Sequence, residues 1–106
     1  MFYQKSENNY RQAIEGIRYK TLVYGQNTSL SEFHLQKGSV MPNHSHPHEQ
    51  TGYMVSGHMS FIIDGKKYEA IPGNSWCIPA HIEHGVEVLE DSIVIEIFSP
   101  VRDEYL

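Results

Sequence analysis

Short apolar stretches separated by turn-forming residues run along the whole chain. The turns recur about every 8–12 residues, a spacing typical of a β-sandwich or β-barrel. The clearest hairpin joins residues 59–63 to residues 66–71 through Asp64-Gly65, because Asp-Gly tolerates the positive φ angles of a two-residue primed turn. The pattern therefore predicts a fold made of short strands.

The same pattern predicts eight strands, at residues 17–24, 30–36, 50–55, 59–63, 66–71, 75–78, 85–89 and 93–98. Only residues 9–14 have a mildly helical pattern, which suffices for one short turn at most. We expect Tyr53, Met54 and Trp76 to pack within the structure that the strands form. The sequence therefore predicts an all-β barrel.

Composition agrees with one small domain over residues 1–106. Of the 106 residues, 40% are apolar and 11% aromatic, which is enough for one core and favours strands over helices. The net charge is -5 and the eight basic residues are scattered, so no nucleic-acid partner is expected. No segment resembles a signal peptide or a membrane span, so no membrane association is expected. The single cysteine, Cys77, fits a reducing cytoplasm, where we expect the protein to reside.

Five of the seven histidines fall in two short segments, residues 43–50 (Asn-His-Ser-His-Pro-His-Glu-Gln) and residues 81–84 (His-Ile-Glu-His). Alternate side chains of an extended strand point to one side, so His44, His46 and Gln50 share a face. A third imidazole from the distant segment would complete a metal site. This clustering indicates a functional site rather than core packing.

Three neutral imidazoles and one amide oxygen form a mixed nitrogen and oxygen shell. Such a shell suits Zn, Ni, Fe, Mn or Cu and does not suit Mg or Ca. His48 has the same parity as His44 and His46, so it either competes as a ligand or holds a ligand in place. We expect one divalent transition metal ion, namely Zn, Ni, Fe or Mn.

Two motifs at the right separation resemble those of the cupins. Gly38, His44-Ser45-His46, Gln50 and Gly57 resemble the first motif, and Gly73, Pro79 and His84 resemble the second. The resemblance implies a small jelly-roll β-barrel, often dimeric, with a metal ion inside it. It implies that the ligands are His44, His46, Gln50 and His84. The barrel would span roughly residues 28–100, flanked by an N-terminal strand and a C-terminal tail, and we expect a homodimer.

A narrower resemblance runs nearly end to end. The histidine segment, the second motif and the ending at residues 98–106 together resemble the KdgF-type pectin-degradation cupins. Members of that group convert 4,5-unsaturated uronates, released by breakdown of pectin or alginate, to the linear keto form. The resemblance therefore implies a role in carbohydrate metabolism and a small anionic sugar acid as the bound partner.

Three positions depart from one or other family pattern. Gln50 replaces the usual cupin Glu but agrees with the KdgF-type group. His81 stands where the second cupin motif usually has Gly, so it either changes the turn or enters the substrate pocket. Glu96 stands where the KdgF-type group has a functional Asp, and the extra methylene moves the carboxylate by about an ångström.

Five residues are candidates for the substrate pocket or its chemistry. Glu96 lies in a strand that is apolar on both faces, so we expect it to be buried and to act as a general acid or base; the alternative is a rim position. Arg102 lies on a tail that could cover the barrel mouth and suits a substrate carboxylate, unless it is a solvated tail charge. Phe98, with the parity of Glu96, is a pocket wall or plain core. His48 and His81 are also assigned to the pocket.

These residues predict Lewis-acid and acid/base catalysis on a sugar acid. A shell without a carboxylate leaves the dication uncompensated, so it should attract an anionic oxygen. Two alternatives stay open on sequence alone. One is a cupin that binds or senses a small molecule without turnover, and the other is a metal-dependent oxygenase.

Overall fold

The structure, a computed structural model, describes all 106 residues. It contains eight strands and one short 3-10 helix: β1 (Arg11–Ile14), β2 (Ile17–Tyr24), β3 (Ser29–Leu35), β4 (Val40–His44), β5 (Glu49–Ile63), β6 (Lys66–Ala70), β7 (Ser75–Ile78), β8 (His84–Ser99) and η1 (Asp103–Tyr105). No helix has the length and apolar character needed to span a membrane. The all-β prediction is therefore confirmed.

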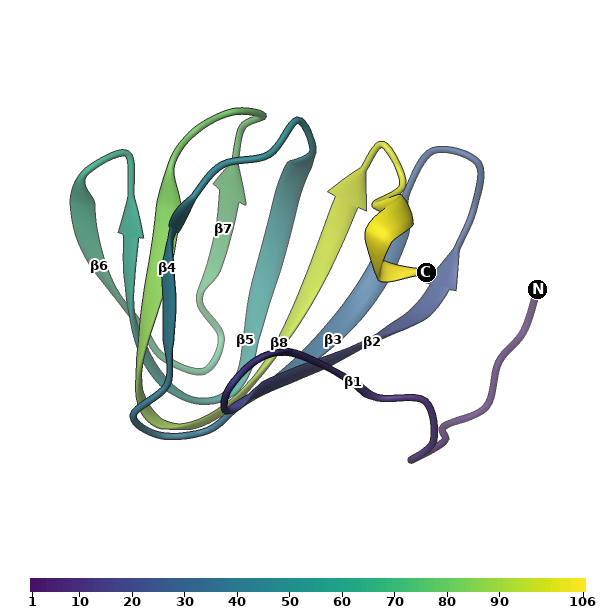
Figure 1. Ribbon diagram of the computed structural model, residues 1–106, viewed down its shortest axis with the longest axis horizontal. Coiled ribbons are helices and arrows are strands. Elements are labelled where there is room, and N and C mark those ends of the chain that lie inside the picture. Colours follow the sequence, from purple (N-terminus) through teal and green to yellow (C-terminus); the bar gives the residue numbers. More distant parts are fainter.

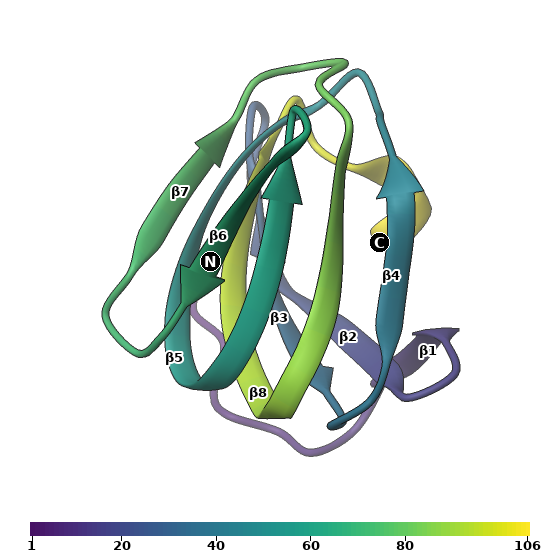
Figure 2. The same cartoon turned by 90° about the vertical axis from the view of Figure 1, so that its left-hand side faces the viewer.

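The strands form one antiparallel sheet that curls into a barrel (Figure 1). The strand order is β1-β2-β3-β8-β5-β6, with β4 paired to β8 and β7 paired to β5. The first half of β5 pairs with β7 and its second half with β6. Figure 2 shows how β5 and β8 bend sharply near their middles, so that two long strands contribute to both sides of the barrel.

The bends explain the main difference between the predicted and observed strands. Residues 50–55 and 59–63 are two halves of β5, and residues 85–89 and 93–98 are two halves of β8. The break predicted between residues 55 and 59 is a series of register shifts within β5. Gly57 has φ 97°, and a Cβ there would lie 2.2 Å from Oγ of Ser92. A glycine at this bulge therefore lets the two bent strands pack closely.

Two short edge strands, β1 and β4, are missing from the strands predicted by the hydrophobic pattern. The helical prediction for residues 9–14 is wrong, because β1 pairs with β2 and this tertiary pairing outweighs a weak local preference. β4 is not among the eight strands predicted from the pattern, although the parity argument treats the segment around His44 as extended. It contains Pro42 and pairs only with β8, so the missing N–H of proline costs no bond at its free edge. The Asp64-Gly65 turn is confirmed, with φ values of 50° and 79°.

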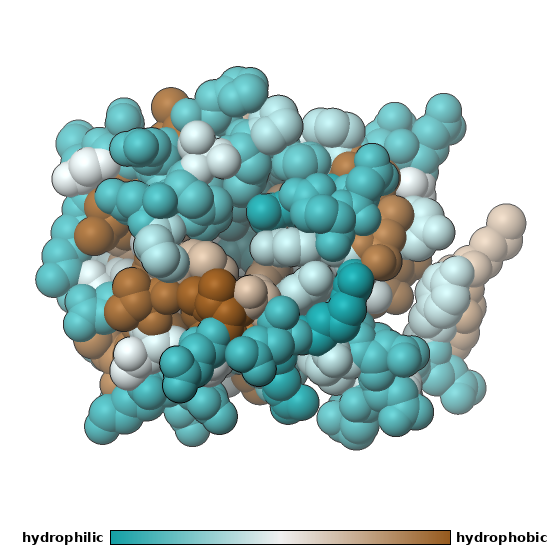
Figure 3. Space-filling view, in the orientation of Figure 1, coloured by the Kyte–Doolittle hydropathy of each residue, from teal (hydrophilic) through white to brown (hydrophobic).

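Inward-facing hydrophobic side chains fill the barrel. Twelve are buried in one cluster, and Phe98, Ile17 and Met54 are among the largest. Tyr53 is 50% exposed, so its predicted interior packing is wrong: neighbours on a strand face opposite sides, and Met54 takes the inner position. Polar side chains cover most of the face that carries β4 and η1 (Figure 3).

Candidate metal centre

Three imidazoles meet at one end of the barrel. His44 is the last residue of β4, His46 lies in the loop that follows, and His84 is the first residue of β8. Each offers a ring nitrogen, and these atoms lie within 4.8 Å of one another. His44 and His84 are direct register partners across β4 and β8. The structure thus brings together the three histidines that the motifs singled out, although His46 lies outside the strand on which the parity argument placed it.

Main-chain carbonyls orient all three rings. Nδ1 of His44 donates to the carbonyl of Pro42 at 2.9 Å, and Nδ1 of His84 donates to that of Ile82 at 2.9 Å. Nδ1 of His46 donates in the same way to the carbonyl of His48 at 3.0 Å. A carbonyl can only accept, so the proton sits on Nδ1 and the lone pair on Nε2. This is the arrangement found behind metal-bound imidazoles.

Burial keeps two of the rings neutral. Removal from water lowers the pKa of His84 to about 4, and it also lowers the pKa of His46. Nε2 of His84 is buried and has no hydrogen-bond partner, which is costly unless a ligand completes it. A neutral imidazole with an unpaired, buried lone pair fits a transition metal ion, so the donor set agrees with the implied cofactor.

Gln50 adds an oxygen to the same point. Its side chain is buried on β5, and its Oε1 lies 2.9 Å from Nε2 of His46. With Nδ1 of His46 protonated, both of these atoms are acceptors, and a cation between them would satisfy both. The Gln50 side chain also lines the cavity that Glu96 lines, and it lowers the pKa of the Glu96 carboxyl. Gln50 therefore links the imidazole cluster to a buried acid.

Glu96 lies inside the barrel, as the apolar strand predicts. It is 4% exposed, and burial raises its pKa to about 8, although hydrogen bonds from Trp76 and Gln50 and the charge of Arg102 oppose the increase. Nε1 of Trp76 donates to the two carboxyl oxygens at 3.1 and 3.3 Å. At neutral pH the carboxyl therefore keeps its proton, which suits general acid/base chemistry.

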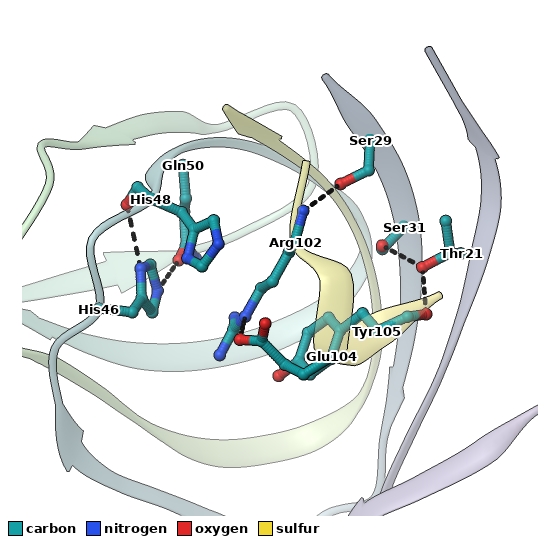
Figure 4. Close-up of polar contacts among 9 residues, drawn as sticks. All are labelled: Thr21, Ser29, Ser31, His46, His48, Gln50, Arg102, Glu104 and Tyr105. Carbon is teal, nitrogen blue, oxygen red and sulfur yellow. Dashed lines mark hydrogen bonds and ion pairs between the residues drawn. The ribbon is translucent and has the colours of Figure 1, made fainter. Parts of the chain in front are cut away.

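The C-terminal tail folds over the mouth of the barrel, and Arg102 lies at its start (Figure 4). The guanidinium lies over two aromatic rings that are nearly perpendicular to each other, with Cζ 4.9 Å from the ring centre of Phe98 and 4.0 Å from that of Tyr105. Nε of Arg102 donates to the carboxylate of Glu104 at 2.8 Å. The backbone N–H of Arg102 donates to Oγ of Ser29 at 3.3 Å. These contacts hold a cation at the opening of the site.

A small cavity of about 50 Å³ joins these groups. Its polar lining consists of His44, Gln50, His84, Glu96 and Arg102, and Phe98 and Tyr105 are among its hydrophobic walls. Pockets for small molecules usually measure about 300–1,000 Å³. The cavity is therefore smaller than such a pocket, and Arg102 and Tyr105 of the tail are part of its lining.

The remaining two sequence-predicted residues lie differently. His48 is buried beside the cluster, with its ring centre 5.5 Å from that of His46 and 6.4 Å from that of Phe98, and its Nδ1 has no partner. His81 is exposed with φ 69°. The backbone N–H of His81 donates to the carbonyl of His46 at 2.8 Å. His81 thus supports the ligand loop through its backbone, and the structure does not bring its side chain to the cavity.

Sequence reasoning missed two contributors to the site. The sequence predicts barrel packing for Trp76, yet a lone indole in a barrel strand usually needs an N–H partner when it is partly buried. That requirement was the available signal. Tyr105 lies on a tail with no strand pattern, and nothing in the sequence shows that its ring stacks on Tyr19, with centroids 4.3 Å apart. Its carbonyl accepts from Oγ1 of Thr21 at 2.7 Å, which anchors the tail.

Comparison with known proteins agrees with this geometry. Residues 31–99 match the family model described as Cupin domain. The chain is 27% identical to the pectin degradation protein KdgF of Dickeya dadantii (strain 3937) over 107 residues, which cover 99% of this chain and 97% of that protein.

Solved structures extend the match to the whole chain. The structure of KdgF from Halomonas sp. matches with a TM-score of 0.93 and 32% identity, covering 100% of both chains. An RmlC-like cupin from Shewanella frigidimarina NCIMB 400 matches with a TM-score of 0.93 at 24% identity, over 100% of this chain and 96% of that one, which supports the fold alone. The chain belongs to the cupin family, and it resembles KdgF along its full length.

Proposed function

We propose that the protein is a metal-dependent enzyme that opens and tautomerises 4,5-unsaturated uronates. The observation that carries the proposal is the connection from the three imidazoles through Gln50 to the buried Glu96 carboxyl. The full-length similarity to proteins named KdgF, one of them described as a pectin degradation protein, supports the same substrate class.

The reaction is an isomerisation in which no atom is gained or lost. In an unsaturated uronate, C1 is a hemiacetal carbon and the ring oxygen is part of an enol ether. Ring opening removes the proton of the C1 hydroxyl and breaks the bond between C1 and the ring oxygen, leaving an aldehyde and an enol. Tautomerisation then places a proton on C4 and forms a ketone at C5. Both halves therefore need a group that moves protons.

Glu96 is suited to that role. Its carboxyl is buried, and its pKa of about 8 leaves it protonated at neutral pH, so it can give a proton to carbon and recover one afterwards. It also lines the cavity that His44 and His84 line. A general acid of this kind contributes about 10²–10⁴-fold to a rate.

Arg102 is suited to holding the substrate carboxylate. It already binds a carboxylate, that of Glu104, at the mouth of the site, and its guanidinium packs against two aromatic rings. His44, His46, Gln50 and His84 would hold the metal ion, which when bound supplies Lewis-acid stabilisation of negative charge on oxygen. Arg102 and the ligand set thus favour an anionic, oxygen-rich molecule.

The proposal is tested with protein purified without a histidine tag and loaded in turn with Zn²⁺, Ni²⁺, Fe²⁺ or Mn²⁺. Each sample is mixed with unsaturated galacturonate, and the loss of alkene absorbance is followed. We expect faster loss than without protein, and we expect chelation to abolish the gain. Rates equal to the protein-free control with all four metals would overturn the enzymatic proposal. Uronate binding without turnover would instead identify a binding module.

A further inference from the structure

Three residues on neighbouring strands form one row that points into the barrel. Gly52 of β5 pairs with Trp76 of β7 on one side and with Glu96 of β8 on the other. Direct partners in an antiparallel sheet project to the same face, so Trp76 and Glu96 project inward two strands apart. Their side chains meet above Gly52, where the indole N–H contacts both carboxyl oxygens.

The glycine is what allows this meeting. A Cβ at residue 52 would lie 2.1 Å from Nε1 of Trp76 and 2.5 Å from Oε2 of Glu96. Both separations are far below van der Waals contact, so any larger residue would force the indole and the carboxyl apart. Residue 52 must be glycine because the side chains of Trp76 and Glu96 occupy the space that a Cβ would take.

The indole also forms a wall. Trp76 lines an open groove of about 650 Å³ that Tyr68, Ala70 and Asn74 line as well, whereas Glu96 lines the inner cavity. The ring of Trp76 packs against Phe61, which borders both spaces, with centroids 5.0 Å apart. The ring therefore lies between Glu96 and the groove, and its N–H is the part that contacts the acid.

We infer that Trp76 is a positioning residue that holds the Glu96 carboxyl against Gln50, and that Gly52 is required for this contact. The inference rests on the proposed function for its catalytic consequence, but the contact itself can be tested without any substrate. A carboxyl whose two oxygens both contact one indole N–H has a restricted orientation in the cavity. A misplacement of about 1 Å at a reacting group can cost on the order of 10²-fold in rate.

The first test uses the fact that the chain has a single tryptophan. The indole N–H therefore gives one ¹⁵N–¹H signal in the whole protein. We expect this proton to exchange slowly with solvent, and we expect Glu96→Leu to shift its signal toward that of a free indole and to speed its exchange. A signal that does not respond to Glu96→Leu would overturn the inference.

The second test removes the N–H but keeps an aromatic ring. Trp76→Phe keeps an aromatic wall, and a crystal structure of this variant should show the Glu96 carboxyl displaced from Gln50. In the metal-loaded enzyme, kcat should fall roughly ten- to hundredfold with KM changed less than about twofold. Combining Trp76→Phe with Glu96→Gln should be no slower than Glu96→Gln alone. An unmoved carboxyl, or an unchanged kcat in an active enzyme, would overturn the positioning role.

A matched pair of glycine variants completes the design. Gly52→Ala should reproduce the shift of the indole signal, whereas Gly25→Ala, whose added Cβ meets nothing within 4 Å, should leave it unchanged. If the wild-type protein turns over no uronate, the proposed function fails. The signal and crystallographic results would then still decide whether Trp76 positions Glu96.

Discussion

Oε1 of Gln50 lies 2.9 Å from Nε2 of His46, and both atoms carry lone pairs because Nδ1 of His46 donates to a carbonyl. Two acceptors at this separation repel unless a cation lies between them. The neutral amide also leaves the charge of a bound dication uncompensated. As a ligand, Gln50 would therefore affect both the affinity of the site for a metal ion and the charge that a substrate would meet.

Gln50→Glu should strengthen metal binding and weaken catalysis. A carboxylate ligand adds a full negative charge, so metal affinity should rise about tenfold, which corresponds to about 1.4 kcal/mol. The same charge would lie beside Glu96 and reduce the attraction for an anionic substrate, so kcat/KM should fall at least about tenfold. Competition with a chelating dye measures the affinity, and the alkene assay measures kcat/KM. Weaker metal binding would contradict the role of Gln50 as a ligand.

His84→Ala should abolish stoichiometric metal binding. Nε2 of His84 is buried without a partner, and no other imidazole replaces it at the start of β8. Elemental analysis of the purified variant should show far less than one ion per chain, and added Zn²⁺ should no longer raise the melting temperature as it does when an ion binds only the folded state.

The matched control is His58→Ala. His58 is a partly exposed imidazole that contacts Glu69 on the outside of the barrel, away from the cluster. Its removal should leave the metal content of the protein unchanged. Equal metal loss in both variants would show that the ion is not held by the three-histidine cluster.

The sequence predicted more of the chemistry than of the path of the chain. His44, His46 and His84 could be singled out because histidines at cupin spacing are uncommon in a core, and Glu96 because its strand is apolar on both faces. That β5 and β8 are single long strands could not be predicted from the sequence. In β5, Ser56-Gly57 has the local pattern of a turn, and its close approach to Ser92 is visible only in the structure.

Contacts between strands that are distant in the sequence also could not be predicted from local sequence patterns. That Trp76 meets Glu96 depends on the register of β7 and β8 against β5, which no local pattern encodes. For His81, in contrast, the sequence suggested a place in the pocket that the structure does not give its side chain. A histidine near a metal motif invites a functional role, but a left-handed backbone conformation turns its side chain away from the cavity.

Glu104→Gln should lower KM without changing kcat. The Glu104 carboxylate accepts a hydrogen bond from Nε of Arg102, so it competes with a substrate carboxylate for the same guanidinium. Removing its charge should lower KM a few-fold, about threefold if the exposed pair contributes roughly 0.6 kcal/mol. Arg102→Lys should have the opposite effect, because an ammonium cannot pair bidentately or stack on the rings of Phe98 and Tyr105. An increase in KM for Glu104→Gln would contradict this account of Arg102.

The pH dependence of stability should identify Glu96 directly. Its pKa is raised from 4.5 to about 8 by folding, so the folded state binds more protons than the unfolded state between these values, and stability falls as pH rises. His84, with its pKa lowered from 6.5 to about 4, acts in the opposite sense: the unfolded state binds more protons, and stability rises with pH up to 6.5. The two effects oppose each other below pH 6.5, and only that of Glu96 remains above it.

The free energy of unfolding of the metal-free protein should therefore fall by up to about 1.4 kcal/mol per pH unit between pH 6.5 and 8. Glu96→Gln should remove this slope, because an amide does not titrate, while keeping the hydrogen-bond acceptor that Trp76 needs. Urea unfolding at half-unit pH intervals, with chelator present for both proteins, measures the difference. Parallel curves for wild type and variant across this window would mean that the Glu96 carboxyl is already ionised at pH 6.5, and a protonated acid would then have no part in the reaction.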